Sequence, residues 1–182
     1  MTTQVTLREI KKRLRLRMNG DVSASMRASG MPYKLNFGLD AASLREIGGS
    51  YSPNAELAET LWIESSRECK ILATMIYPKS TFSPELAETW LEGCFTAELV
   101  EQFIFNLLQH LPFAPELAAL WSNHPDSHHR SAGYVLTLRL LLSKKISTVN
   151  PDTLTHASAD KSDENAVLRL HACRLMERCE CN

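Results

Sequence analysis

The sequence predicts an all-α fold of the α-α superhelix class, a short solenoid of paired helices, and three observations predict it. One phrase occurs three times, as ELAETLW at 56–62, ELAETW at 85–90 and ELAALW at 116–121. A proline precedes each copy, and the tryptophans that close the copies lie 28 and 31 residues apart. Eight prolines and seven glycines are too few for the turns of a sandwich or barrel. A period of about 30 residues is typical of helical units that bury their apolar faces by stacking.

We expect residues 1–182 to form one domain with three parts. Residues 1–50 predict basic N-terminal helices, 51–142 predict three helix-pair repeats, and 143–182 predict a polar connection with a C-terminal helix. Thr6 and Glu9 are spaced as a capping box for the first helix, and Asn19-Gly20 is a stop signal for it.

The remaining helices follow from apolar periodicity and from caps. The first part predicts further helices at 21–29 and 41–51, the second opened by Asp40. The repeats pair 53–64 with 66–76, 84–92 with 98–111, and 115–121 with 128–142. Residues 143–162 predict one poorly formed helix and a loop, and the last helix is expected at 163–179.

Apolar residues of the repeated phrase are expected to pack between repeats. These residues are Leu57, Leu61, Leu86, Leu117 and Leu120. A tryptophan closes each copy of the phrase, so we interpret the three tryptophans as packing residues and not as a platform for a ligand.

Bulk composition predicts a cytoplasmic protein. No stretch approaches the roughly 20 apolar residues of a membrane span, and the N-terminus MTTQVTLREIKK lacks the apolar core of a secretion signal. The five cysteines are scattered, which suits a reducing compartment better than a disulfide framework. We expect no association with a membrane.

Charge is distributed unevenly, although the net charge is only −1. Residues 1–50 carry nine basic and four acidic side chains, a balance of +5, which leaves −6 for residues 51–182. A basic segment attracts phosphate groups. From charge alone, a solvated helix face is the simpler interpretation.

Two clusters contain residue types that bind metal ions. The segment 123–129, NHPDSHH, fits no known zinc spacing, and Asp126 or Ser127 as a helix N-cap explains it more simply. Near the C-terminus stand His171, Cys173, Cys179 and Cys181, without a C-x-x-C pair. A terminal helix with exposed thiols is the simpler interpretation there. The chain also lacks phosphate-loop, dinucleotide, serine-hydrolase and zinc-peptidase motifs, so we expect neither a metal nor a cofactor.

Two arginines occupy similar positions at the beginning of the second helix of a repeat. A cation there opposes the helix macrodipole, so it needs a partner. Arg67 has Glu64 and Glu68 beside it, which indicates a structural role. Arg130 has no acidic residue within the next three positions, so a phosphate contact and a structural role are equally open.

Some phrases resemble a known family. LNFGLDAASLREI at 35–47 follows a basic helix, and Leu61-Trp62 is followed shortly by Arg67-Glu68. With these phrases the run 26–142 resembles the bacterial DNA alkylation repair enzymes of the AlkD type, which are HEAT-like repeat DNA glycosylases. The resemblance implies a positively charged concave face that grips duplex DNA. It also implies an aromatic and acidic cluster that stabilises a cationic alkylated nucleotide as its glycosidic bond breaks.

The resemblance also implies roles for single residues. The family's catalytic aspartate corresponds to Glu101, and its DNA-contacting arginine corresponds to Arg130. Its two tryptophan positions fall on Ala97, with Phe95 the nearest aromatic residue, and near His171. The predicted DNA-binding residues are Arg130, His129, Lys11, Arg13, Arg17, Phe95 and His171.

Two functions follow as expectations. The first is a DNA-binding HEAT-like protein that excises cationic alkylated purines from duplex DNA. The second is a non-catalytic HEAT-like scaffold that binds nucleic acid or a protein through its concave face, since neither tryptophan position is kept. Duplex DNA is the expected partner and a protein is the alternative. The sequence does not indicate an oligomeric state.

Overall fold

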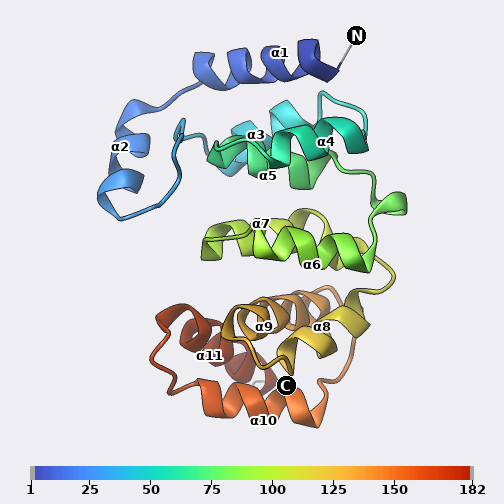
Figure 1. Ribbon diagram of the computed structural model, residues 1–182. Helices are drawn as coiled ribbons and strands as arrows, with labels where there is room; N and C mark the ends of the chain where they lie inside the picture. Colours follow the sequence, from blue (N-terminus) through green and yellow to red (C-terminus); the bar gives the residue numbers. More distant parts are fainter. Residues whose placement is uncertain (1–2, 181–182) are drawn as a thin grey trace. The chain divides into compact units, whose positions relative to one another are not determined.

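The computed structural model describes residues 3–180, and helices dominate it (Figure 1). The chain forms two compact units, Met1–Phe82 and Ser83–Asn182. In the described residues, the one extended pairing is a single parallel bridge between Leu35 and Ser66. The predicted all-α class is therefore confirmed, whereas the single domain over 1–182 stays a prediction. Every helix between residues 3 and 180 is too short or too polar to cross a lipid bilayer.

From residue 3 onward, unit 1 contains five α-helices and one short 3-10 helix. They are α1 (Thr3–Leu16), α2 (Gly20–Ala28), α3 (Ala41–Gly48), α4 (Ala55–Trp62), α5 (Arg67–Ile76) and η1 (Lys79–Thr81). Helix α5 packs against α3 and α4, and α1 packs against α4. Leu7, Ile10 and Leu14 form the buried stripe of α1, as the amphipathic pattern of this helix requires.

A buried carboxylate ties the loop before α3 to the beginning of α5. The Glu68 side chain is fully buried and accepts hydrogen bonds from the backbone N–H groups of Phe37, Gly38 and Leu39, at 3.1, 3.1 and 3.4 Å. The Arg67 guanidinium donates to Glu68 at 3.0 Å and to the carbonyl of Leu39 at 3.0 Å. The predicted structural role of Arg67 is confirmed, with Glu68 as its partner.

Gly38 allows this loop to approach α2 closely. Its φ is +71°, a left-handed conformation that side chains disfavour. A Cβ atom here would lie 2.4 Å from the carbonyl oxygen of Asn19 and 2.7 Å from the amide nitrogen of Ser23. Only glycine fits between these backbone atoms.

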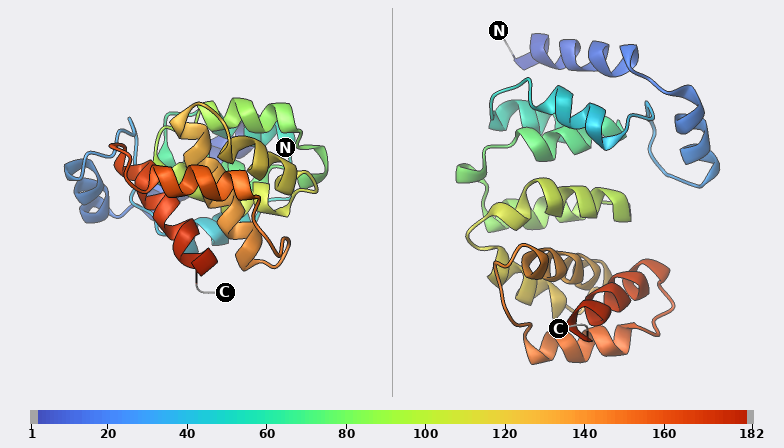
Figure 2. Two further views of the ribbon diagram at one scale, coloured as in Figure 1. Left: turned by 90° about the horizontal axis from the view of Figure 1, so that it is seen from below. Right: turned by 180° about the vertical axis from the view of Figure 1, so that it is seen from behind.

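As far as residue 180, unit 2 contains six α-helices and a second 3-10 helix. They are α6 (Pro84–Glu92), α7 (Ala97–Asn106), η2 (Leu108–His110), α8 (Ala114–Ser122), α9 (Ser127–Leu142), α10 (Pro151–Asp160) and α11 (Ala166–Glu180). Helix α9 is central, because α7, α8 and α11 all pack against it, and α10 packs against α8 and α11. Figure 2 shows α11 beside α9 and α10 from two further directions.

Gly133 sets the crossing of α8 and α9. A Cβ atom at this position would lie 2.3 Å from the amide nitrogen of Ser122, the last residue of α8. The two helix backbones therefore approach more closely than any other residue type at 133 would permit.

The three tryptophans are packing residues, as predicted. Trp62, Trp90 and Trp121 are all buried, and Trp90 lies against Phe103 with ring centroids 5.7 Å apart. Trp121 is fully buried, and its indole N–H donates to Glu88 at 2.6 Å. The repeated phrase thus supplies core residues within each unit.

Several predicted helix boundaries are wrong, for local reasons. Thr6 does not cap the first helix, because α1 begins at Thr3; Asn19 caps α2 instead of closing α1. Asn54 caps α4, so this helix begins at Ala55 and not at the proline. The helix predicted over 98–111 ends at Asn106, and the chain continues as η2.

Two other sequence predictions also need correction. Leu120 does not face a neighbouring helix, because its side chain is exposed, whereas Leu57, Leu61 and Leu117 are buried as predicted. The segment expected to hold a poorly formed helix contains the well-formed α10, which Asn150 caps. The helix predicted over 84–92 is correct in both bounds, since α6 is Pro84–Glu92.

Among the described cysteines, two are fully buried: Cys69 on α5 in unit 1 and Cys94 just after α6 in unit 2. Burial raises the pKa of the Cys69 thiol to about 11. Cys173 and Cys179 are partly exposed on α11, and Cys181 lies outside the described residues.

Candidate functional site

Glu101 lines a hollow of about 360 Å³ in unit 2, between α7, α9 and α11. The polar lining comes from Glu101, Gln102, Arg139, His171 and Arg174, and the apolar lining comes from Phe105, Val135, Leu138 and Leu142. A carboxylate in a mostly apolar hollow, with aromatic and cationic neighbours, is a typical arrangement of a ligand site.

The Glu101 carboxylate is held through one of its two oxygens. Oε1 accepts a hydrogen bond from Arg174 at 3.0 Å and from His171 Nε2 at 3.4 Å. Oε2 accepts none from any residue between 3 and 180. The hydrogen bond from His171 and the charge of Arg174 hold the pKa of Glu101 below its ordinary value, although partial burial opposes them. Glu101 is therefore a carboxylate at neutral pH, with one oxygen available.

His171 is the second predicted site residue in this cavity. Only 2% of it is exposed, and its Nδ1 lies 2.7 Å from the hydroxyl oxygen of Ser131. The structure thus brings together Glu101 of α7 and His171 of α11. These two residues are 70 positions apart in the sequence.

Three charged or aromatic residues of the cavity were missed by sequence reasoning. Phe105 lies one turn after Glu101 on α7, and the Arg139 guanidinium lies over its ring, 4.8 Å from the centroid. Arg139 also donates to Gln109 at 3.2 Å. Arg174 lies one turn after His171 on α11. Helical spacing from Glu101 and His171 would have found Phe105 and Arg174; no sequence signal indicates Arg139.

Phe95 does not lie in the Glu101 cavity. It lines a separate hollow of about 180 Å³, together with Ala97, His128 and Ser131. The aromatic ring that shares the cavity with Glu101 is that of Phe105, which follows Glu101 on α7, and not that of Phe95, which precedes it.

Arg130 is engaged within unit 2, away from the Glu101 cavity. It forms a two-point ion pair with Asp160, at 2.7 and 3.1 Å, and donates to the carbonyls of His124 and Pro125. Tyr134 donates to the same carboxylate at 2.6 Å. Burial acts to raise the pKa of Asp160, but the hydrogen bonds from Arg130 and Tyr134 outweigh it and lower the pKa. Of the two roles that the sequence left open, these contacts favour the structural one.

Replacing Arg130 with methionine is expected to lower the free energy of unfolding by about 2 to 3 kcal/mol, because Asp160 stays largely buried without its cation. A carboxyl with a lowered folded-state pKa stabilises the protein fully above its unfolded pKa of about 4 and loses that effect as the pH falls through the folded value. Urea unfolding at pH 7 and at pH 3 measures the loss of stability and its dependence on pH. The difference between wild type and variant should be smaller at pH 3, and a variant as stable as wild type at pH 7 would contradict the structural role.

Asp126 caps α9, as predicted, and organises the histidines around it. Its carboxylate accepts from the backbone N–H of His129 at 3.0 Å and lies 2.8 Å from His129 Nδ1. The other ring nitrogen of His129 lies 3.2 Å from Glu88. The hydrogen bonds from the ring and from the backbone N–H of His129 lower the pKa of Asp126, although burial opposes them.

His124, Asp126 and His129 are close enough to hold a metal ion in common. The imidazole rings of His124 and His129 stack with centroids 4.1 Å apart. His124 Nδ1, however, accepts the backbone N–H of Asp126 at 3.1 Å, and Asp126 is already the helix cap. A metal ion would have to displace these bonds, so the geometry favours the cap.

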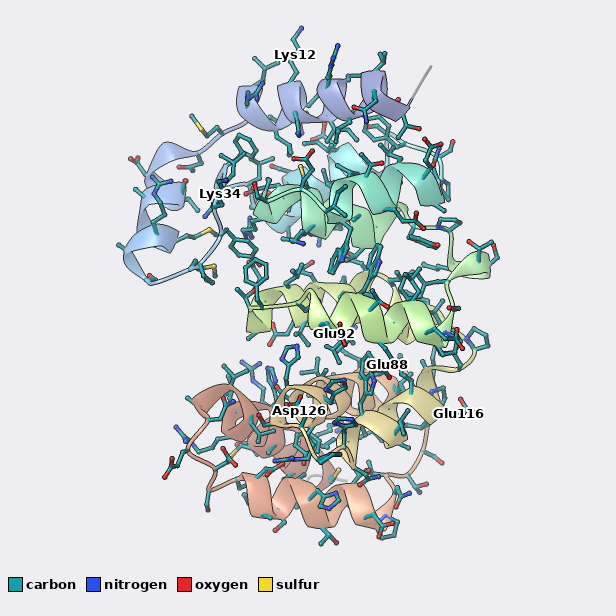
Figure 3. The ribbon with its side chains drawn as sticks, viewed as in Figure 1. Lys12, Lys34, Glu88, Glu92, Glu116 and Asp126 are labelled. Carbon is teal, nitrogen blue, oxygen red and sulfur yellow. The ribbon has the colours of Figure 1, made fainter. Side chains whose placement is uncertain are left out.

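The predicted DNA-binding cations on α1 and just after it all have partners within unit 1. Lys11 pairs with Glu64 at 2.6 Å and Arg17 pairs with Glu46 at 2.6 Å, while Arg13 donates to Ser50 at 3.2 Å and lies over the Tyr51 ring. Another three cations follow a helical stripe on α1, are exposed, and make no hydrogen bond or ion pair with residues 3–180. They are Arg8, Lys12 and Arg15. Lys12 projects away from the rest of unit 1 (Figure 3).

The structure is that of an all-helical repeat protein with a carboxylate in a largely apolar hollow of unit 2. Residues 10–169 match the family described as DNA alkylation repair enzyme, and the chain belongs to this family. The resemblance inferred from the sequence is thereby confirmed.

A solved structure is similar to this chain over most of its length. It is described as a new family of proteins related to the HEAT-like repeat DNA glycosylases with affinity for branched DNA structures. The match has a TM-score of 0.77 at 16% sequence identity and covers 97% of this chain and 74% of that chain. This likeness confirms the HEAT-like fold. No curated protein sequence matches the chain.

Proposed function

We propose that the chain binds duplex DNA and that the Glu101 cavity receives a cationic alkylated purine nucleotide, whose glycosidic bond is then hydrolysed. The observation that carries the proposal is an ionised carboxylate with one open oxygen in a largely apolar hollow. Negative charge in such a surrounding stabilises a positive charge more strongly than it does in water.

The proposed reaction develops positive charge on the sugar. As the bond from C1′ to the purine nitrogen breaks, its electron pair neutralises the alkylated base, which leaves, and the sugar becomes oxocarbenium-like. Water then adds to C1′ and releases a proton. Glu101 stabilises the sugar cation electrostatically, and the ring of Phe105 offers a π-face to the same charge.

Cations near the cavity and on α1 are proposed to contact phosphates. In unit 2, Arg139 and Arg174 line the cavity and Arg174 is half exposed. In unit 1, the stripe of Arg8, Lys12 and Arg15 is open to solvent. Each phosphate neutralised releases condensed counterions, so affinity should fall as salt rises. DNA as the ligand also favours a cytoplasmic location, which we propose.

A second candidate function is binding of branched DNA without excision. It is favoured by the absence of tryptophan from the cavity lining, since Trp90 and Trp121 are both buried in the core of unit 2. The similar solved structure is described by its affinity for branched DNA. In this alternative Arg139 and Arg174 would contact phosphates, and Glu101 would do no chemistry.

Glu101→Gln is expected to reduce the release of free base from methylated duplex DNA by about 100-fold, because the variant keeps the shape of the side chain and loses its charge. The measurement is chromatographic detection of released base in single-turnover reactions. Glu116→Gln is the matched control, since it makes the same change on an exposed residue of α8. The control should retain the wild-type rate.

Two other outcomes decide between the candidates. Equal release by wild type and Glu101→Gln would contradict the catalytic role of Glu101. No release by any form, combined with salt-sensitive binding to a four-way junction that Arg174→Ala weakens, would support the binding scaffold. Binding to neither a linear duplex nor a junction would contradict both candidates.

A further inference from the structure

The buried imidazole of His171 lies between the Glu101 carboxylate and the buried hydroxyl of Ser131. Ser131 on α9 and His171 on α11 are both buried, and Ser131 Oγ lies 2.7 Å from His171 Nδ1. On the other side of the ring, Nε2 lies 3.4 Å from Glu101 Oε1. The three side chains therefore form a continuous row from the helix core to the cavity.

The charge of Glu101 determines where the proton of His171 lies. An ionised carboxylate only accepts hydrogen bonds, so the ring nitrogen that faces it, Nε2, carries a proton. In the neutral ring Nδ1 then has no proton and accepts the hydrogen bond from the Ser131 hydroxyl. The Glu101 carboxylate thereby fixes the tautomer of His171, and the hydrogen bond from Ser131 to Nδ1 fixes the orientation of the ring and of its Nε2–H group.

This arrangement also selects the oxygen that a ligand would meet. His171 and Arg174 both donate to Oε1, and Oε2 receives no bond from the described residues. A glutamate side chain that nothing holds would sample several rotamers and would have to be ordered when the ligand binds. We propose that Ser131 and His171 are positioning residues that hold the Glu101 carboxylate in one orientation, with Oε2 open to a positively charged ligand. The identity of that ligand rests on the proposed function, whereas the orientation of Glu101 by Ser131 and His171 does not depend on it.

The groups around Glu101 differ in how strongly they act on it. Helix α11 contributes His171 and Arg174, α9 contributes Arg139, and Glu98 lies one turn earlier on α7. The hydrogen bond from His171 contributes most to the lowered pKa of Glu101. Arg174 is half exposed, so solvent screens its charge. The buried imidazole is accordingly the partner whose loss should matter most.

The test is an NMR titration of the Glu101 side-chain carboxyl in the DNA-free protein. His171→Met is expected to raise the pKa of Glu101, because the Nε2–H donor is lost. His171→Gln places an amide N–H near the former Nε2 and is expected to retain more of the lowered pKa. Ser131→Ala is expected to raise it as well, by less than His171→Met. Thr137→Val is the matched control, since it removes a buried hydroxyl of α9 that bonds to Ser122, and should leave the titration unchanged.

Near-UV circular dichroism establishes that each variant is folded, and His171→Gln provides a readout if His171→Met does not fold. An unchanged Glu101 titration in Ser131→Ala and in the folded His171 variants would overturn the proposal. So would an equal shift in Thr137→Val, which would indicate general loosening of α9. Because no DNA is present, the titrations are independent of base release. If the titrations shift as expected but the wild-type protein releases no base, only the proposed excision is rejected.

Discussion

Replacing Glu68 with alanine is expected to lower the free energy of unfolding of unit 1 by about 3 to 5 kcal/mol. The carboxylate is fully buried and accepts three backbone N–H groups of residues 37–39, the Ser66 hydroxyl and the Arg67 guanidinium. Its removal leaves a buried cation and several backbone donors without acceptors, and each such group costs about 1 to 3 kcal/mol. A typical domain has only about 5 to 15 kcal/mol in total, so much of unit 1 should unfold readily.

Hydrogen exchange detected by mass spectrometry measures this effect in each unit separately. Peptides from α3 to α5 should exchange much faster in Glu68→Ala, while peptides from α8 and α9 should be unchanged. The control is Glu46→Gln, which removes an exposed ion pair with Arg17 and should alter exchange very little. Protection of α3 to α5 at the wild-type level would show that the loop is held by other contacts.

Replacing Gly133 with alanine is expected to destabilise unit 2 by about 3 kcal/mol. The added methyl group would lie 2.3 Å from the amide nitrogen and 2.7 Å from the Cα of Ser122, so α8 and α9 must separate. Alanine is the better helix former by about 1 kcal/mol, and this gain partly offsets the strain. Because α9 carries Ser131 and Arg139, the separation should also disturb the Glu101 cavity.

Thermal unfolding followed by circular dichroism measures the change, and a paired substitution isolates its cause. Gly20→Ala makes the same replacement in α2, where a Cβ atom would meet nothing within 4 Å. That variant should be as stable as wild type or slightly more stable. A Gly133→Ala protein that unfolds at the wild-type temperature would mean that the helices can move apart without cost.

The fold could be predicted largely from the repeated phrase, because helix pairs and their spacing are local properties of the sequence. The caps Asp40 and Asp126 could be predicted, since each acts on a residue three positions away. The break after Asn106 was missed, because apolar residues continue through it and periodicity alone does not show the change to a 3-10 helix.

The site could be predicted only in part. Family resemblance indicated Glu101 and His171, which the structure brings together. It also indicated Arg130, whose partner Asp160 lies 30 positions away on another helix. No local pattern reveals such a partner, and the same limit concealed Arg139, whose proximity to Glu101 depends on how α7 and α9 pack.

The two buried cysteines give each unit its own reporter. Cys69 belongs to unit 1 and Cys94 belongs to unit 2, and neither side chain reaches solvent in the folded protein. A thiol reagent therefore modifies either one only when the surrounding helices open, and the modified peptide identifies which unit opened. The protein thus carries natural labels that reveal whether its halves unfold together or independently, with no engineered probe.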